Sequence, residues 1–309
     1  MYYPYFRGKQ YELITIRENA QLLKKSEFVP IIEPVKESIK GLEKAIDSVI
    51  DADGEIIVIV NPYYGDHKLN SDKIKSLIDD KGDSNITAGL LLTEDILDNE
   101  VQSLLNSYSG RGISIIHAGY SDGKNLKSIL ENGDIKNNIF LENYCGRLYR
   151  RHFSGNRVLL RDGFEKRTNR KHPDVEFFSD LHVTFREEGM DGFGDFLIVG
   201  DDYSETGGPA YAIAIHLTFI DPEKDDEMHI HHFKSIRQDD PTDPAGKFSE
   251  ALKKLVEEVN SPSSKILQTK AVRELLQLHK RGHYPGLGYV KKLSMQHHIE
   301  TLSNYFDNN

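Results

Sequence analysis

The chain has 309 residues, of which 38% are hydrophobic and 28% charged, which allows one large domain or two ordinary ones with a real core. The net charge of −10 argues against nonspecific coating of nucleic acid, although it leaves room for a local basic patch. No apolar run approaches the roughly 20 residues that span a bilayer, and the first residues do not resemble a signal peptide. The only cysteine, Cys145, excludes an internal disulfide and a cysteine-based zinc site, so a cytoplasmic location is expected.

Short apolar runs bounded by turn residues predict eight strands, and most are apolar on both faces, as in buried parallel strands. These runs span 28–34, 55–62, 87–94, 112–119, 137–143, 157–163, 194–202 and 210–219. Amphipathic stretches at 9–25, 36–54, 71–80, 94–110 and 121–133 predict helices before and between the first five strands. This alternation predicts an α/β fold, a closed (β/α)8 TIM-like barrel, with a mixed open α/β sheet as the alternative.

The pattern becomes irregular after the fifth strand. The connection 164–192 is long, and about eight residues join the last two runs, fewer than a parallel crossover needs. Those two runs therefore predict an antiparallel hairpin or a degenerate last unit, and 227–236 is a candidate to pair beside them. The rest of the chain predicts helices at 244–260, 265–282 and 292–306. We expect a barrel domain over 1–242 and a helical extension over 243–309 packed on it.

Polar residues end almost every predicted strand. Catalytic residues of a barrel enzyme lie at the carboxyl ends of its strands, so Glu33, His117, Glu142 and Asp162 are the candidate catalytic residues. Carboxylates with an imidazole could bind a divalent ion or perform general acid–base catalysis, but no sequence spacing distinguishes these roles. The alternative is structural, because acids and amides at strand ends also cap the helices that follow.

A basic segment interrupts this acidic chain between residues 147 and 171. Its arginines match the geometry of phosphate, and the aromatic residues Tyr144, Tyr149 and Phe153 lie among them. The candidate phosphate-binding residues are Arg147, Arg150, Arg151 and Arg161. The alternative is that these side chains pair with the acid-rich region that follows, from Asp174 to Asp191.

Two further polar clusters are candidates for binding. The loop GDDYSETGGPA at 200–210 carries Asp201, Asp202 and Tyr203, and its composition suits a functional loop, although it matches neither a Walker nor a GxGxxG motif. His229 and His231 would share one face of a strand and could supply two metal ligands, but no third ligand is evident nearby. The four histidines of the C-terminal region are expected at the surface. They are His279, His283, His297 and His298.

Several stretches of the sequence resemble a bacterial family related to the phage-type beta protein family. They include YYPYFRGKQYELITIRE, PIIEPVK, VNPYYGD, EFFSDLHVTFREEGMDGFGDF, TDPAGKFSEAL and GHYPGLGYVKKLSMQHHIETL. The resemblance implies a gene that stands beside one for a restriction-endonuclease-fold nuclease, in a two-component anti-phage or toxin–antitoxin arrangement. It carries over no catalytic residue.

These observations leave three readings open. The chain is a regulatory or sensing partner of a nuclease, or a metal-assisted phosphodiester or nucleotide hydrolase with its site at the strand ends, or a barrel whose polar rim is only structural. Whether the chain is an enzyme is therefore left open. A divalent metal, a nucleotide or nucleic acid, and a protein partner are all compatible with the sequence.

Overall fold

The computed structural model describes residues 1–82, 84–205, 208 and 210–308. Contacts divide the chain into two compact units, each built from two segments. Unit 1 comprises 1–161 and 184–196, and unit 2 comprises 162–183 and 197–309. The boundary expected after residue 242 falls inside unit 2. Thr206, Gly207 and Pro209 of the loop at 200–210 lie outside the described residues.

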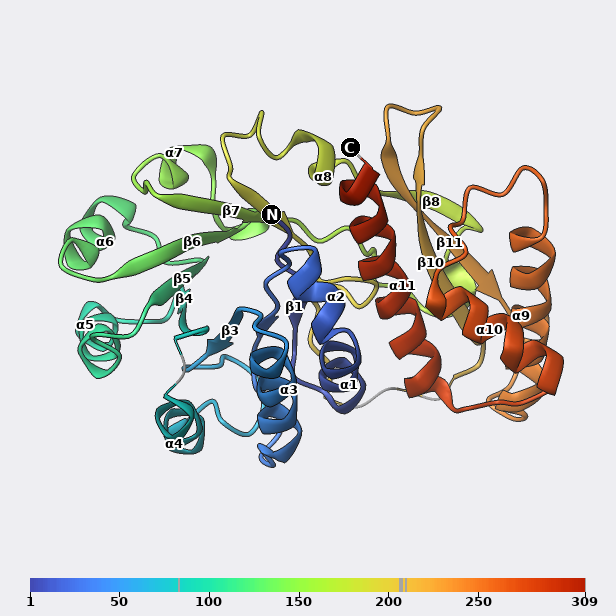
Figure 1. Ribbon diagram of the computed structural model, residues 1–309, viewed down its shortest axis with the longest axis horizontal. Helices are drawn as coiled ribbons and strands as arrows, with labels where there is room; N and C mark the ends of the chain where they lie inside the picture. The colour runs from blue at the N-terminus through green and yellow to red at the C-terminus, as the bar shows by residue number, and fades with distance from the viewer. Residues whose placement is uncertain (83, 206–207, 209, 309) are drawn as a thin grey trace. The chain divides into compact units, whose positions relative to one another are not determined.

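Unit 1 is an eight-stranded parallel barrel (Figure 1), which confirms the predicted fold class. Its strands, in spatial order, are β1 (Tyr5–Phe6), β2 (Ile31–Ile32), β3 (Ile56–Ile59), β4 (Ile86–Thr93), β5 (Ile113–Ala118), β6 (Ile135–Leu141), β7 (Asn156–Leu160) and β9 (Gly192–Gly194). The first and last strands meet through backbone bonds. The Tyr3 amide donates to the Phe193 carbonyl at 2.8 Å, and the Tyr5 amide donates to the Asp195 carbonyl at 2.9 Å.

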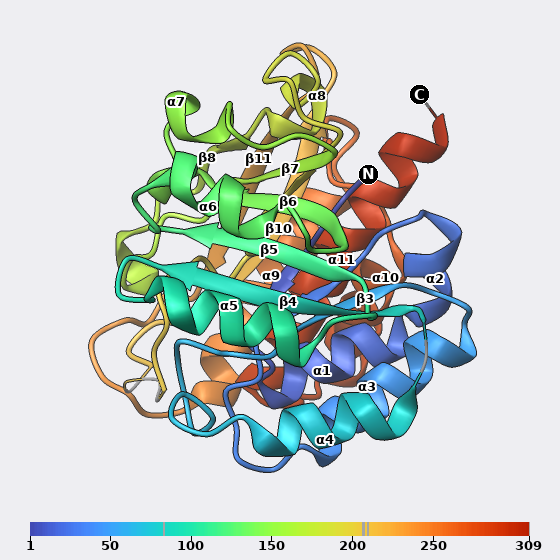
Figure 2. The ribbon, with the colours of Figure 1, turned by 90° about the vertical axis from the view of Figure 1, so that its left-hand side faces the viewer.

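Helices connect the strands and cover the outside of the sheet, as Figure 2 shows for the helices beside β4 and β5. They are α1 (Gln10–Glu18), α2 (Ala20–Lys25), α3 (Lys40–Asp51), α4 (Asp72–Lys81), α5 (Asp98–Ser107), α6 (Gly123–Leu130), η1 (Glu142–Tyr144) and α7 (Arg147–Arg150). Alternate strand residues such as Ile57 and Ile59 fill the barrel interior, and the residues between them are buried as well. Burial on both faces explains the continuous apolar runs.

Unit 2 contains a three-stranded antiparallel sheet in the order β10 (Ala214–Asp221), β11 (Glu227–Lys234) and β8 (Val175–Ser179). Its long helices are α9 (Pro244–Val259), α10 (Lys270–Arg281) and α11 (Leu287–Asn308), and its short 3-10 helix is η2 (Asn169–Lys171). The helix α8 (Leu181–Thr184) lies where the chain passes from unit 2 back to unit 1. One sheet face packs Ile215, Leu217 and Phe233 into a core shared with the three long helices.

Some predicted elements differ from the observed ones. The two-residue strand β1 was not predicted, and the run 194–202 is not a strand, because β9 ends at Gly194 and Leu197 enters a turn with φ of 51°. The run 210–219 supplies β10, which pairs antiparallel with β11 instead of completing the barrel. The prediction that His297 and His298 lie at the surface was also wrong, because α11 buries both.

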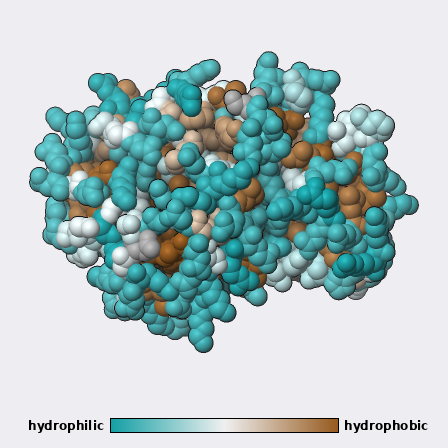
Figure 3. Space-filling view, in the orientation of Figure 1, coloured by the Kyte–Doolittle hydropathy of each residue, from teal (hydrophilic) through white to brown (hydrophobic). Residues whose placement is uncertain are grey.

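The exterior agrees with a charged, hydrophilic composition. The face shown in Figure 3 is mostly hydrophilic, with hydrophobic residues in scattered patches. None of the described helices is both long and apolar enough to cross a membrane.

Candidate functional site

Glu33 lies at the carboxyl end of β2 and is fully buried. One carboxylate oxygen accepts hydrogen bonds from the backbone amides of Tyr63 and Tyr64, at 2.8 and 3.1 Å. The other accepts from the Tyr5 hydroxyl at 2.9 Å and pairs with the Arg7 guanidinium. Four donors fill the acceptor positions of a carboxylate, so Glu33 holds the loop after β3 against β1. This geometry suits a structural role better than that of a catalytic base.

Glu142 and Arg161 form an ion pair at the ends of β6 and β7. The Arg161 Nε donates to one Glu142 oxygen at 2.6 Å and its Nη2 donates to the other at 3.0 Å, a two-pronged arrangement. The pair is partly exposed to solvent, the Arg161 side chain by 25% and the Glu142 side chain by 30%. The Arg161 guanidinium, which was predicted to bind phosphate, therefore binds a carboxylate of the same unit.

His117 lies on the outward side of β5, whereas its neighbour Ile116 faces the barrel interior. Its ring bonds the Tyr149 hydroxyl at 2.9 Å and the Asn138 side chain at 3.1 Å, and it stacks on Phe140 with ring centroids 4.6 Å apart. Burial lowers the pKa of His117 to about 3, so the ring is neutral near pH 7. These contacts share no residue with those of Glu33, so the structure does not bring the two candidates together.

Cys145 lies beside this histidine. Its thiol donates to the His117 carbonyl at 3.1 Å, and burial raises its pKa to about 12. A thiol of this kind is a weak nucleophile at neutral pH.

Asp162 belongs to unit 2, where it orders the loop that follows residue 200. One carboxylate oxygen accepts from the Phe164 amide at 2.9 Å, and the other accepts from the Asp201 amide at 2.7 Å. The Lys166 ammonium donates to the Asp202 carbonyl at 3.0 Å. Tyr203 is half-buried in the same loop. The segment after β7, which carries Asp162, is thus hydrogen-bonded to the loop that carries Asp201 and Asp202.

The remaining predicted phosphate-binding arginines do not converge on one point. The exposed Arg147 donates to Glu188 at 3.1 Å, and the buried Arg150 lies 3.7 Å from the other Glu188 oxygen. Arg151 follows α7 and is exposed. Pairing with the acid-rich region, the alternative that the sequence left open, accounts for Arg147 and Arg150.

A cavity of about 550 Å³ opens at the carboxyl ends of β3 and β4. Asn61 forms part of its wall and is fixed by two hydrogen bonds of 2.9 Å to the backbone of Leu91. The Lys68 ammonium lies 4.2 Å from the centre of the Tyr63 ring. The other polar lining residues are Thr93, Asp95, Asn99, Glu100 and Ser103. The cavity occupies the end of the barrel at which barrel enzymes bind their ligands.

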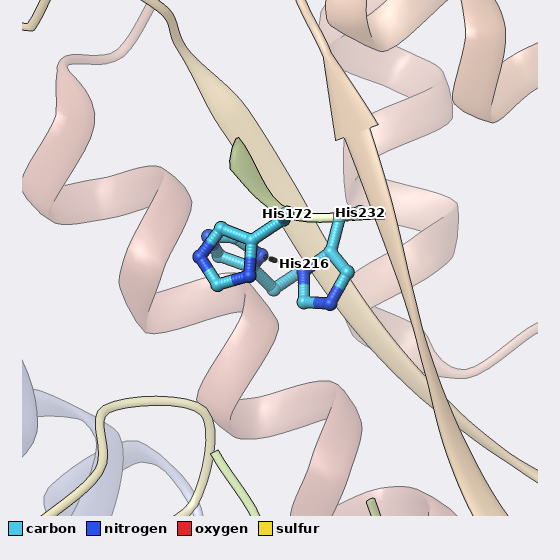
Figure 4. Close-up of side chains that lie close together, drawn as sticks. All are labelled: His172, His216 and His232. Carbon is cyan, nitrogen blue, oxygen red and sulfur yellow. Dashed lines mark hydrogen bonds between the residues drawn. The ribbon is translucent and has the colours of Figure 1, made fainter. Parts of the chain in front are cut away.

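Three histidines that the sequence analysis did not group together meet in unit 2. They are His172, His216 and His232, each offering one ring nitrogen within 4.8 Å of the others (Figure 4). The sequence held part of this signal, because antiparallel pairing of 210–219 with 227–236 places His216 opposite His232. His172 gave none, since it lies in the irregular connection.

Comparison with known proteins adds little to this picture. No protein-family model matches the chain, and no curated protein matches it. Among solved structures it is similar to the N-acetylneuraminate lyase of Mycoplasma synoviae, with a TM-score of 0.41 and 12% identity over 63% of this chain and 66% of that chain, just under two thirds. It is also similar to the sialic acid aldolase of Ruminococcus gnavus, with a TM-score of 0.42 and 11% identity over 63% and 67% of the two chains.

Proposed function

We propose that this chain is the sensing component of a two-component anti-phage or toxin–antitoxin-like system in the cytoplasm, in which it regulates a nuclease encoded nearby. The partner rests on the family resemblance. The observation that supports sensing is the cavity at the ends of β3 and β4, whose volume of about 550 Å³ lies in the range of small-molecule sites.

The lining of the cavity indicates the class of ligand. Lys68 supplies an ammonium group, Asp95 and Glu100 supply carboxylates, and Thr93 and Ser103 supply hydroxyls. This combination of one positive group, two negative groups and two hydroxyls suits a small polar ligand with hydroxyl groups and one anionic group. A nucleotide has this chemistry, and Lys68 is the residue to contact its phosphate.

Metal-assisted hydrolysis of a phosphodiester or nucleotide is the second candidate function. The observation that favours it is the group of three histidines in unit 2, because a metal held by three side chains can activate water. Glu33 and Glu142 give this candidate little support, since each is engaged by an arginine.

Co-expression with the neighbouring nuclease tests the first proposal. We expect the two proteins to co-purify and nucleoside mono- or diphosphates to change the nuclease activity of the complex. Lys68→Ala should abolish that response, whereas Lys124→Ala, which alters an exposed lysine outside the cavity, should retain it. A monodisperse protein that does not bind the nuclease and leaves the nuclease activity unchanged would contradict the proposal.

A further inference from the structure

We propose that His172, His216 and His232 form a binding site for one divalent transition-metal ion, with Zn²⁺ as the best-matched ion. The site lies wholly within unit 2 and does not depend on the function proposed for the barrel cavity. One nitrogen of each ring lies within 4.8 Å of the other two (Figure 4).

The fold brings the three rings together from separate segments. His216 of β10 and His232 of β11 are direct register partners, so their side chains project from the same face of the sheet. His172 follows η2 and stacks on His232, with ring centroids 4.3 Å apart. Three separate segments thus supply one ligand each, with His172 lying 44 positions before His216 and His216 lying 16 positions before His232.

His172 provides an independent indication that this cluster binds a ligand. The residue is only 3% exposed, and its buried Nε2 atom makes no hydrogen bond to any residue that the structure describes. Leaving a buried polar atom without a partner costs roughly 1–3 kcal/mol, and native proteins seldom tolerate it without a reason. A metal ion bound at this nitrogen would satisfy it.

Glu176 orients two of the three rings. One of its oxygens accepts from His232 Nε2 at 2.9 Å and from His172 Nδ1 at 3.4 Å. Arg167 fixes the carboxylate through two contacts of 2.7 and 2.8 Å. With those ring nitrogens protonated, the lone pairs of His172 Nε2 and His232 Nδ1 remain available for a metal. Histidine ligands typically donate their second nitrogen to a carboxylate in this way.

Metal binding requires a small rearrangement at His216. Its Nδ1 lies 2.6 Å from His232 Nδ1, and because His232 donates its Nε2 proton to Glu176, His216 is the donor of this hydrogen bond. Two imidazole nitrogens on a tetrahedral Zn²⁺ at bond lengths of 2.0–2.1 Å are about 3.3 Å apart. The rings must therefore separate by less than 1 Å, while the proton moves from Nδ1 to Nε2 of His216 by exchange with solvent.

The donor set selects the class of metal. Three imidazoles suit Zn²⁺, Co²⁺, Ni²⁺ and Cu²⁺, whereas Mg²⁺ and Ca²⁺ require oxygen ligands. Burial lowers the pKa of His232 to about 4 and the pKa of His216 well below its usual value, so both rings are neutral at pH 7, as ligands must be. Three ligands leave a fourth position for water or another ligand, and the Phe164 ring, 5.3 Å from His216, forms an apolar wall nearby.

The two histidines that the sequence named as possible metal ligands, His229 and His231, do not belong to this site. His229 bonds Glu227 at 3.1 Å, and His231 stacks on Phe233 with ring centroids 3.9 Å apart. His231 occupies the strand position next to His232, so its side chain points to the opposite face of the sheet. It is therefore a matched control for the proposed site.

The test is metal binding by the full-length protein after treatment with a chelator. We expect titration with ZnCl2 or CoCl2 to show one ion per chain, with Co²⁺ giving the visible absorption of a tetrahedral nitrogen site. Glu176→Gln should weaken binding about 10–100-fold, as typical for a residue that orients a ligand. Loss of a ligand in His172→Ala, His216→Ala or His232→Ala should weaken it further, and His231→Ala should bind like the wild type.

Three results of the titrations would overturn the proposal. They are a wild-type protein that binds neither Zn²⁺ nor Co²⁺, binding that His172→Ala leaves unchanged, and binding that His231→Ala weakens as much as His172→Ala does. Circular dichroism checks that each variant is folded. If an alanine variant does not fold, X-ray absorption of the wild-type Zn²⁺ complex counts the imidazoles directly, and a number other than three would contradict the site.

Discussion

Glu33 shows how one buried carboxylate ties together the start of the barrel. Its side chain connects β1 through Tyr5, the residue after β1 through Arg7, and the loop after β3 through the amides of Tyr63 and Tyr64. Arg7 packs its guanidinium against aromatic rings, with the Tyr64 ring centre 4.8 Å away. Removing Glu33 would leave these buried donors without their acceptor, and the cost of those unsatisfied groups is its contribution to stability.

Replacing Glu33 with alanine should therefore destabilise the protein. The change leaves the buried Arg7 charge without its carboxylate, and breaking a buried pair typically costs about 3–5 kcal/mol. Urea denaturation should show a lower midpoint for Glu33→Ala, whereas Glu131→Ala, at an exposed position, should match the wild type. Equal midpoints for the two variants would contradict the structural role and revive a catalytic one.

His117 should make stability depend on pH. Its pKa falls from 6.5 in the unfolded chain to about 3 in the folded protein, so between these values only the unfolded chain takes up the proton. The contribution of His117 to stability is complete above pH 6.5 and is lost as the pH falls toward 3, by up to about 1.4 kcal/mol per pH unit.

The glutamine variant isolates this effect. His117→Gln keeps a polar side chain beside Tyr149 and Asn138 but removes the titration. The free energy of unfolding, measured by urea denaturation between pH 7 and pH 4.5, should fall more steeply for the wild type than for His117→Gln. Parallel curves would show that His117 does not carry the acid sensitivity.

At the scale of elements, apolar runs predicted the barrel because both faces of its strands are buried, one by the helices outside and the other by the packed interior. Strands β2 to β7 all fall on or beside predicted runs. The ends of the barrel were harder to predict, because β1 and β9 have two and three residues and owe their place to pairing with neighbours. The apolar run 194–202 forms a turn instead of a strand. It is apolar because the turn is buried, with Phe196, Leu197 and Ile198 nearly inaccessible to solvent.

The candidate sites were less predictable than the fold. The sequence identified residues at strand ends but not the direction of each side chain, and His117 faces outward while Glu33 faces inward. The sequence also named His229 and His231 as possible ligands. The histidines that lie together are instead His216 and His232, which are paired across two strands, and His172, which reaches them from a distant loop. A one-residue difference in strand register decides which histidines share a face.

For the molecule as a whole, closure of the barrel depends on a close approach at its last strand. A Cβ atom at Gly194 would lie 2.1 Å from the Tyr3 carbonyl oxygen and 2.3 Å from a Leu160 methyl group, so alanine cannot fit without moving backbone. Such overpacking typically costs about 1–3 kcal/mol, and here it acts where β9 meets the first residues of the chain.

Gly194→Ala should lower the urea midpoint, whereas Gly146→Ala, with open space around its Cβ, should leave it nearly unchanged. Because the strain would fall on the closing strands, hydrogen exchange of the Tyr3 and Tyr5 amides should accelerate in Gly194→Ala before the rest of the barrel exchanges. A Gly194→Ala protein with wild-type stability and protection would show that the first and last strands are not held together in this way.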